Sequence, residues 1–151
     1  LTEYYPTRTE AAIFASQGTA ISEAAIRCTG PGPVIVDLGA GNCAKGATLF
    51  PILQPRRYVA VDISADYVAG ALAQLQREHP LLDLVGVGLD FSRRLSLPSE
   101  LPGERPLVFY PGSSIGNFDP QGALELLRQA RAMAGQGALL IGVDLVKDER
   151  V

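Results

Sequence analysis

The sequence has few cysteines, no long apolar run and no excess of positive charge. Its only cysteines, Cys28 and Cys43, are too few for a disulfide framework and lack the spacing of a metal site. We therefore expect free thiols and a cytoplasmic protein without a bound metal. No apolar run approaches the ~20 residues that a membrane-spanning helix needs. The net charge of −3 argues against nucleic acid or an anionic membrane surface as the main partner.

The remaining composition suits one hydrophobic core. Of the 151 residues, 47% are hydrophobic and 19% are charged, which is typical of an ordinary folded domain. The chain begins at Leu1 rather than Met and stops at Val151, directly after an apolar strand pattern. We expect it to be part of a longer protein. Nothing in the sequence indicates an oligomeric state.

The segment before Pro33 is helical in character. A Thr7-x-x-Glu10 capping box opens the stretch "TRTEAAIFASQ", in which apolar residues recur at helical spacing. A second helical stretch begins at Ser22, and a Gly-Pro-Gly-Pro run ends the segment. The pattern predicts two helices.

Beyond this segment, short apolar runs alternate with helical stretches. Strands that are apolar throughout are typical of a parallel sheet that is covered on both faces. Strand–helix alternation with short connections predicts an α/β fold, a doubly wound Rossmann-like sheet. The predicted strands are 34–38, 58–63, 82–90, 106–111 and 137–146, and the predicted helices are about 44–53, 64–79 and 120–134.

Gly39 and Gly41 directly follow the first predicted strand. In doubly wound sheets, ligands bind at the carboxyl ends of the strands. Glycine permits a tight turn there and a close approach of the backbone to a ligand. The string "GAGNCA" also satisfies the dinucleotide pattern G-x-G-x-x-G/A. An NAD site and a tight turn without any ligand are therefore both open interpretations.

Acidic residues near the strand ends favour S-adenosylmethionine (SAM) over NAD. Asp62 ends the second strand about 20 residues after the second glycine, where a carboxylate accepts both hydroxyls of a ribose, but this fits NAD and SAM equally. Asp37 would repel a pyrophosphate but suits a cofactor with an amino group and a sulfonium. Asp90 and Phe91 end the third strand and suit an adenine, although Asp90 equally fits a turn cap. This pattern is typical of class I methyltransferases.

The fourth strand ends in "PGSSIGNF" (111–118), which carries two glycines and Asn117. Gly112 and Gly116 permit close approach of a ligand, and Asn117 both donates and accepts hydrogen bonds. In a methyltransferase of this class, the loop would face the methyl group and its acceptor. Asn117 also fits the cap of the helix that begins at Pro120, so both roles stay open.

Five segments in this order resemble the histidine-specific N-alpha-methyltransferases, which form hercynine in ergothioneine biosynthesis. They extend over essentially the whole chain: "EYYPTRTE" (3–10), "VDLGAGNCAKG" (36–46), "YVAVDIS" (58–64), "PGSSIGNF" (111–118) and "GVDLVKD" (142–148).

The resemblance implies a SAM-dependent methyltransferase acting on the alpha-amine of an amino acid, most simply L-histidine. It implies a cofactor site of Gly39, Lys45, Asp62, Asp90 and Phe91, to which the strand-end argument adds Asp37 and Gly41. It also implies an amino-acid pocket lined by Tyr4, Gly112 and Asn117. We expect Asn117 to orient the amine, and the proton to leave through Tyr4, a carboxylate or water.

The resemblance also implies how the chain is divided. Residues 1–32 would contribute to the substrate side, residues 33–151 would form part of the SAM-binding domain, and a second domain beyond them would recognise the substrate side chain. Two alternatives stay open: an NAD-binding oxidoreductase domain, and a non-catalytic fragment that keeps the fold.

Overall fold

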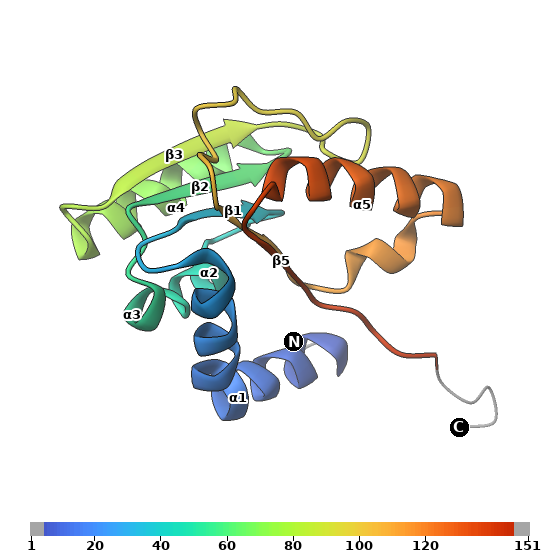
Figure 1. Ribbon diagram of the computed structural model, residues 1–151, viewed down its shortest axis with the longest axis horizontal. Coiled ribbons are helices and arrows are strands. Elements are labelled where there is room, and N and C mark those ends of the chain that lie inside the picture. Colours follow the sequence, from blue (N-terminus) through green and yellow to red (C-terminus); the bar gives the residue numbers. More distant parts are fainter. Residues whose placement is uncertain (1–4, 147–151) are drawn as a thin grey trace.

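A five-stranded parallel sheet lies at the centre of the chain (Figure 1). The computed structural model describes residues 5–146. The strands are β1 (Val34–Leu38), β2 (Arg57–Asp62), β3 (Asp83–Gly88), β4 (Leu107–Tyr110) and β5 (Ala138–Ile141). The helices are α1 (Tyr5–Thr29), α2 (Ala44–Ala47), α3 (Phe50–Leu53), α4 (Ala65–Glu78) and α5 (Pro120–Ala134), with a short 3-10 helix η1 (Ser114–Asn117). Within this described part, no helix combines the length and apolarity that a membrane span needs.

The strand order is β3-β2-β1-β4-β5, and every neighbouring pair is parallel. From β1 the chain first adds strands on one side of the sheet and then, from β4, on the other. The carboxyl ends of β1 and β4 therefore lie side by side at the point where the order switches. In open α/β sheets this is where ligands bind. The predicted parallel, doubly wound fold is confirmed.

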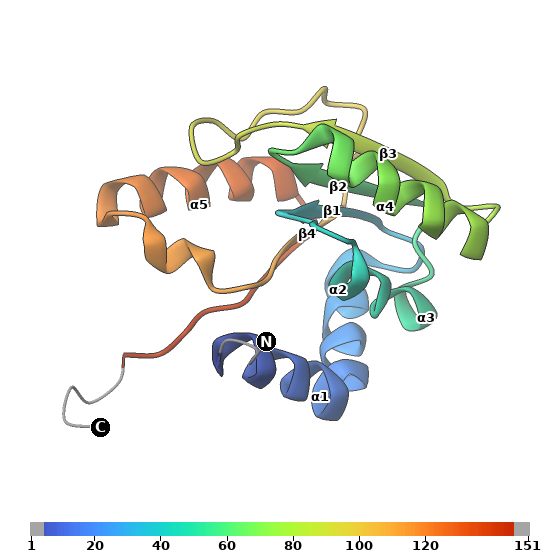
Figure 2. The same cartoon turned by 180° about the vertical axis from the view of Figure 1, so that it is seen from behind.

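Two hydrophobic cores lie on opposite faces of the sheet, because successive strand residues point to opposite sides. Ile35 and Tyr58 join the core that includes residues of α1, α3 and α4. Val36 and Val59 join the core under α5. Figure 2 shows α4 in front of the sheet and Figure 1 shows α5 on the opposite side.

The N-terminal segment forms one bent helix rather than two. α1 runs without a break through Ser22, which is buried inside it and is not an N-cap. Its axis bends in both ribbon views. Within α1, the hydroxyl of Ser16 donates a hydrogen bond to the Ala12 carbonyl oxygen (3.0 Å), a contact that often bends helices. The edge-to-face pair of Phe14 and Phe109, with centroids 5.9 Å apart, packs α1 onto the sheet.

The predicted helix 44–53 is also wrong in detail, because the structure divides it into α2 and α3. Pro51 has no N–H to donate back along a continuous helix. Gly46 lets α2 approach the sheet very closely. A Cβ atom at this position would lie 2.6 Å from Asp37 Oδ2 and 2.7 Å from the hydroxyl of Tyr58.

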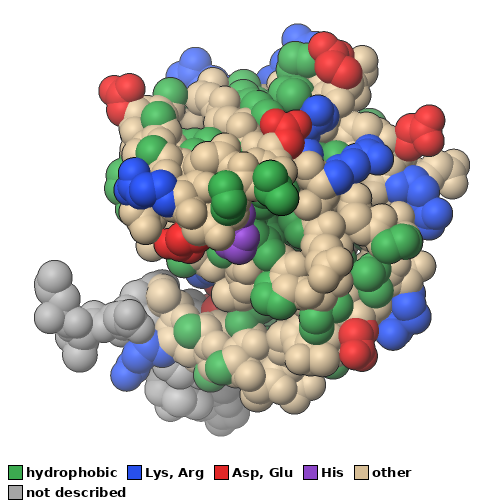
Figure 3. Space-filling view, turned by 90° about the vertical axis from the view of Figure 1, so that its left-hand side faces the viewer, with side chains coloured by type: hydrophobic (Ala, Val, Ile, Leu, Met, Phe, Trp, Pro, Cys, Tyr) green, Lys and Arg blue, Asp and Glu red, His purple; other side chains and the backbone are tan. Residues whose placement is uncertain are grey.

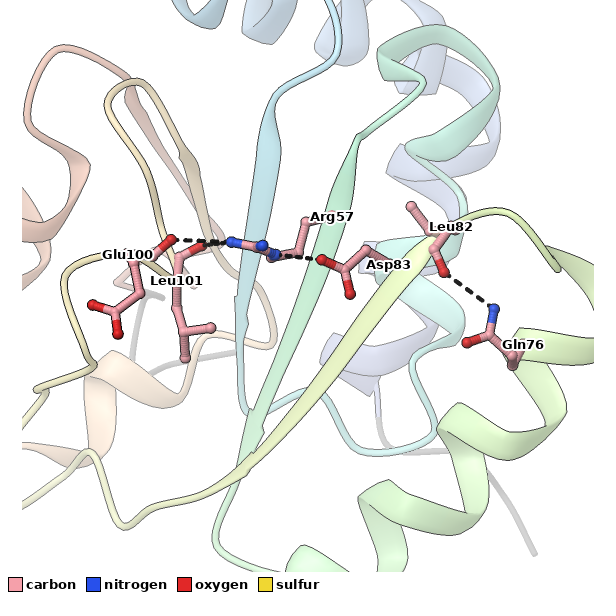
Figure 4. A network of polar contacts seen from close by, with 6 residues as sticks. All are labelled: Arg57, Gln76, Leu82, Asp83, Glu100 and Leu101. Atoms are coloured by element: carbon pink, nitrogen blue, oxygen red, sulfur yellow. Dashed lines mark hydrogen bonds and ion pairs between the residues drawn. The ribbon is translucent and has the colours of Figure 1, made fainter.

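The connection between β3 and β4 contains no α-helix. Arg57, at the amino end of β2, binds this connection to the sheet (Figure 4). The Nε of Arg57 donates to Asp83 Oδ2 (2.7 Å). Its Nη1 donates to the carbonyl oxygens of Glu100 (3.0 Å) and Leu101 (3.1 Å). This network holds the part of the connection at Glu100 and Leu101 at the edge away from the glycine loop.

Candidate functional site

The glycine loop turns over the carboxyl end of β2. Gly39 and Gly41 have φ angles of +75° and +55°, a region that glycine adopts without steric cost. The N–H groups of Gly39 and Ala40 both donate to the Val61 carbonyl oxygen, at 2.8 and 3.1 Å. The predicted tight turn is therefore present at the predicted position.

Most amides of this loop already have partners within the protein. Gly41 N–H donates to Asp62 Oδ2 (3.0 Å), and Ala44 N–H donates to Asn42 Oδ1 (3.0 Å). Cys43 N–H donates to the Ala40 carbonyl oxygen (2.8 Å). α2, which follows, has only four residues, so its dipole is small. A pyrophosphate would have to compete with these acceptors for the N–H groups of the loop.

Asp62 is held rigidly at the end of β2. Its Oδ2 accepts from Gly41 N–H, and its Oδ1 accepts from Ser64 N–H (3.1 Å). Each carboxylate oxygen keeps capacity for a further donor. The arrangement orients an acceptor toward the space beside the glycine loop.

Phe91 lies beside the glycine loop, whereas the Asp90 carboxylate is hydrogen-bonded within its own turn. The Phe91 ring packs edge-to-face on Tyr110, with centroids 5.6 Å apart. A Cβ on Gly39 would lie 3.8 Å from its Cζ, so the ring reaches the glycine loop. Asp90 Oδ1 accepts from both the N–H and the hydroxyl of Ser92. The turn-cap role of Asp90 is thus observed, and its contact with adenine stays a prediction.

Asp37 lies beneath the loop, against α2. It is only 1% exposed, and its Oδ2 accepts a hydrogen bond from the Tyr58 hydroxyl. Burial raises the pKa of Asp37 to about 7 and outweighs the Tyr58 hydrogen bond and the positive charge of Lys45. Burial likewise raises the pKa of Tyr58. Asp37 therefore supports the strand that leads into the loop through its buried bond to Tyr58. A direct contact between Asp37 and a cofactor stays a prediction.

The sequence reasoning missed one part of the site, the carboxylate of Glu10. Its Oε2 accepts from Gly112 N–H (2.6 Å), and its Oε1 forms an ion pair with Lys45. The expected capping box is wrong, because this side chain extends across to the end of β4. No local signal predicts a contact between positions so far apart in sequence.

Asn117 ends η1 and is exposed. Asp119 is the N-cap of α5, with its Oδ1 accepting from Gly122 N–H (2.6 Å). The capping role considered for Asn117 is therefore wrong. Within residues 5–146, the side-chain amide of Asn117 forms no hydrogen bond. Tyr4 lies outside the described residues.

Two hollows of about 560 and 550 Å³ lie between α4 and the α2–α3 segment, and no predicted site residue lines them. His79 lines one of them and packs edge-to-face on Phe50, with centroids 5.2 Å apart. Figure 3 shows this histidine in purple beside apolar side chains. These hollows lie on the face of the sheet covered by α4, and the first also borders the residues after the glycine loop, Asn42 and Cys43.

A family model described as "Histidine-specific methyltransferase, SAM-dependent" matches residues 1–151. The chain belongs to this family. The match confirms the resemblance that the five segments suggested. It also names SAM as the cofactor on which the family depends.

Two curated members support the assignment. The histidine N-alpha-methyltransferase of Mycobacterium tuberculosis is 34% identical over 154 residues, and that of Mycolicibacterium smegmatis is 35% identical over 153 residues. Each comparison covers 98% of this chain and 46% of the relative. The chain thus spans less than half the length of these two family members.

Solved structures confirm the fold class. The sugar N-methyltransferase from Streptoalloteichus is similar with a TM-score of 0.63, at 17% identity, over 99% of this chain and 62% of that one. A magnesium protoporphyrin IX methyltransferase from Synechocystis, solved with bound SAM, gives a TM-score of 0.56 at 16% identity, over 89% and 61% of the two chains. At these identities the likeness concerns the fold alone.

The residues at this edge of the sheet fit the cofactor that the family uses. Asp62 offers an anchored carboxylate for a ribose, and Phe91 offers an apolar ring beside the loop. Lys45 offers a cation with 43% of its side chain exposed. These groups fit a nucleoside joined to an amino acid.

Proposed function

We propose that the protein containing this chain transfers methyl groups from SAM to the alpha-amine of L-histidine, and that this chain supplies the cofactor side of the site. The observation that carries the proposal is the glycine loop, whose amides are already bonded internally beside an anchored Asp62. The family match and the two mycobacterial relatives support the same activity.

Each proposed cofactor contact follows from the chemistry of the side chain. Asp62 accepts hydrogen bonds from the ribose hydroxyls. Phe91 packs on the adenine ring, and Asp90 accepts from its amino group. Lys45 holds the carboxylate of the amino-acid part, the only anionic group in the molecule. When bound, SAM supplies a methyl group attached to a positively charged sulfur.

Three further residues shape the path of the loop around the cofactor. Gly39 lets the backbone turn at a φ angle of +75°, beside the Phe91 ring. Gly41 fixes the Asp62 carboxylate through its N–H. Asp37 holds the strand end through Tyr58, from beneath. Asp37 therefore supports the loop, and its predicted contact with the amino group or the sulfonium of the cofactor stays part of the proposal.

The acceptor side is built from the loop that follows β4. Asn117 is exposed and its amide is uncommitted in the described part of the chain, so it suits both the amino and the carboxylate group of an amino acid. Gly112 lines the same pocket, and Tyr4 completes it. Alignment of the amine with the methyl group would contribute up to about 7–11 kcal/mol. The amine must be neutral to react, and Tyr4, a carboxylate or water takes its proton.

We further propose a cytoplasmic enzyme that makes hercynine for ergothioneine biosynthesis. The resemblance of the five segments supports the pathway, and the scarcity of cysteine supports the compartment. The net charge of −3 supports a small-molecule substrate rather than a nucleic acid.

Methyl transfer by the full-length protein tests this function. Isotopically labelled SAM and L-histidine should give a methylated histidine detectable by mass spectrometry, with other amino acids as parallel acceptors. Transfer to another amino acid in preference to histidine would contradict the substrate. Absence of transfer to any of them, with SAM bound, would favour a non-catalytic role.

A further inference from the structure

We infer that Glu10 is a positioning residue that joins the cofactor side of the site to the acceptor side. The inference rests on the proposed function, in which Lys45 holds the carboxylate of the cofactor. Glu10 comes from α1, Lys45 from α2 and Gly112 from the loop after β4. One carboxylate therefore contacts both α2 and the loop after β4, near the point where the strand order switches.

The contacts of Glu10 are close on three sides. Its two oxygens contact Lys45 Nζ and Gly112 N–H separately. A Cβ on Gly142, just beyond β5, would lie 2.9 Å from its Oε2. Lys45 Nζ would in turn lie 3.8 Å from a Cβ on Gly112. The carboxylate thus fills the junction of three segments.

Burial indicates that Glu10 acts through its neighbours rather than on a ligand. Its side chain is 15% exposed, and its Oε1 is shielded from solvent. The Lys45 side chain is 43% exposed and its ammonium has three donors. Lys45 can therefore keep Glu10 as one partner while it donates to a second carboxylate.

The physical benefit is preorganisation. A lysine side chain is long and flexible, and fixing it when a ligand binds costs conformational entropy. The pairing with Glu10 restricts Lys45 before the ligand arrives, which lowers that cost. The bond to Gly112 N–H fixes the start of the acceptor loop from the same carboxylate. Without this preorganisation, the negative charge of Glu10 would repel the carboxylate of the cofactor and weaken its binding. Whether loss of Glu10 weakens or strengthens cofactor binding is therefore a direct test.

Two ligands separate positioning from simple stability. S-Adenosylhomocysteine carries the amino-acid carboxylate, and 5′-methylthioadenosine keeps the nucleoside and sulfur but lacks it. Calorimetric titration of the full-length protein with each ligand would compare wild type, Glu10→Ala and Glu10→Gln. The control is Glu23→Ala, at an exposed position of the same helix.

We expect Glu10→Ala to weaken S-adenosylhomocysteine binding about tenfold and to leave 5′-methylthioadenosine within about twofold. Glu10→Gln should recover part of the loss, because its amide oxygen still accepts from Gly112 N–H. It is nearly isosteric, so it remains informative if the alanine variant does not fold. Glu23→Ala should change neither affinity.

Equal losses for both ligands would mean that Glu10 only stabilises the fold and would overturn the inference. Unchanged or tighter S-adenosylhomocysteine binding in Glu10→Gln would overturn it too, because Glu10 would then be neutral or competing with the ligand. Failure of the wild-type protein to bind S-adenosylhomocysteine would instead refute the proposed function, and this inference with it.

Discussion

Replacement of the buried Asp37 by asparagine should make the stability of the protein less sensitive to a rise in pH from acidic to neutral values. The carboxyl is 1% exposed, and burial raises its pKa from the ordinary 3.8 to about 7. The folded state therefore holds the proton more tightly than the unfolded chain does. The stabilising contribution is complete below pH 3.8 and is lost as the pH rises through about 7.

The size of this effect follows from the two pKa values. The difference between 3.8 and about 7 corresponds to about 4 kcal/mol of unfolding free energy at most. The amide introduced by Asp37→Asn would keep an acceptor for the Tyr58 hydroxyl and carries no charge to bury. We expect wild type to lose about 2–4 kcal/mol relative to Asp37→Asn between pH 4.5 and pH 8.

Chemical unfolding of the full-length protein and of Asp37→Asn at several pH values would measure this difference. Asp66→Asn, at an exposed position of α4, is the matched control. A constant gap between wild type and Asp37→Asn across this pH range would refute the reasoning, because it would mean that Asp37 is ionised throughout.

Three further substitutions test other parts of the account. Gly46→Ala should destabilise the protein by about 1–3 kcal/mol, because its Cβ would meet Asp37 and Tyr58; a melting temperature equal to wild type would contradict the close approach. Asp62→Asn should weaken S-adenosylhomocysteine by about 1.5–3 kcal/mol in calorimetry, and unchanged affinity would exclude the ribose contact. Asn117→Ala should lower kcat/KM for histidine more than about threefold without changing cofactor affinity; equal kinetics would remove Asn117 from the substrate site.

Elements with clear local signals were predictable from the sequence. α5 has its predicted bounds of 120–134, because Pro120 opens it and apolar residues recur at helical spacing. β1 also matches its predicted range, since a short, wholly apolar run before glycines is typical of a buried parallel strand. Ser64 caps α4 as expected, with its hydroxyl accepting from Tyr67 N–H.

Elements that depend on distant contacts were not predictable in the same way. Thr7 and Glu10 have the spacing of a capping box, but the Glu10 side chain is better satisfied by Lys45 and by Gly112, which lies across the fold. The site shows the same division. The glycines and Asp62 follow from strand ends, whereas the role of Glu10 appears only when α1 packs against the sheet.

The glycine loop, as we interpret it, binds SAM and not a dinucleotide. Calorimetric titration of the full-length protein with S-adenosylhomocysteine, and with NADH in a parallel cell, tests it most directly. We expect saturable binding of S-adenosylhomocysteine and no heat from NADH, because the loop amides are bonded to Val61, Ala40, Asp62 and Asn42. Binding of NADH without S-adenosylhomocysteine would contradict it.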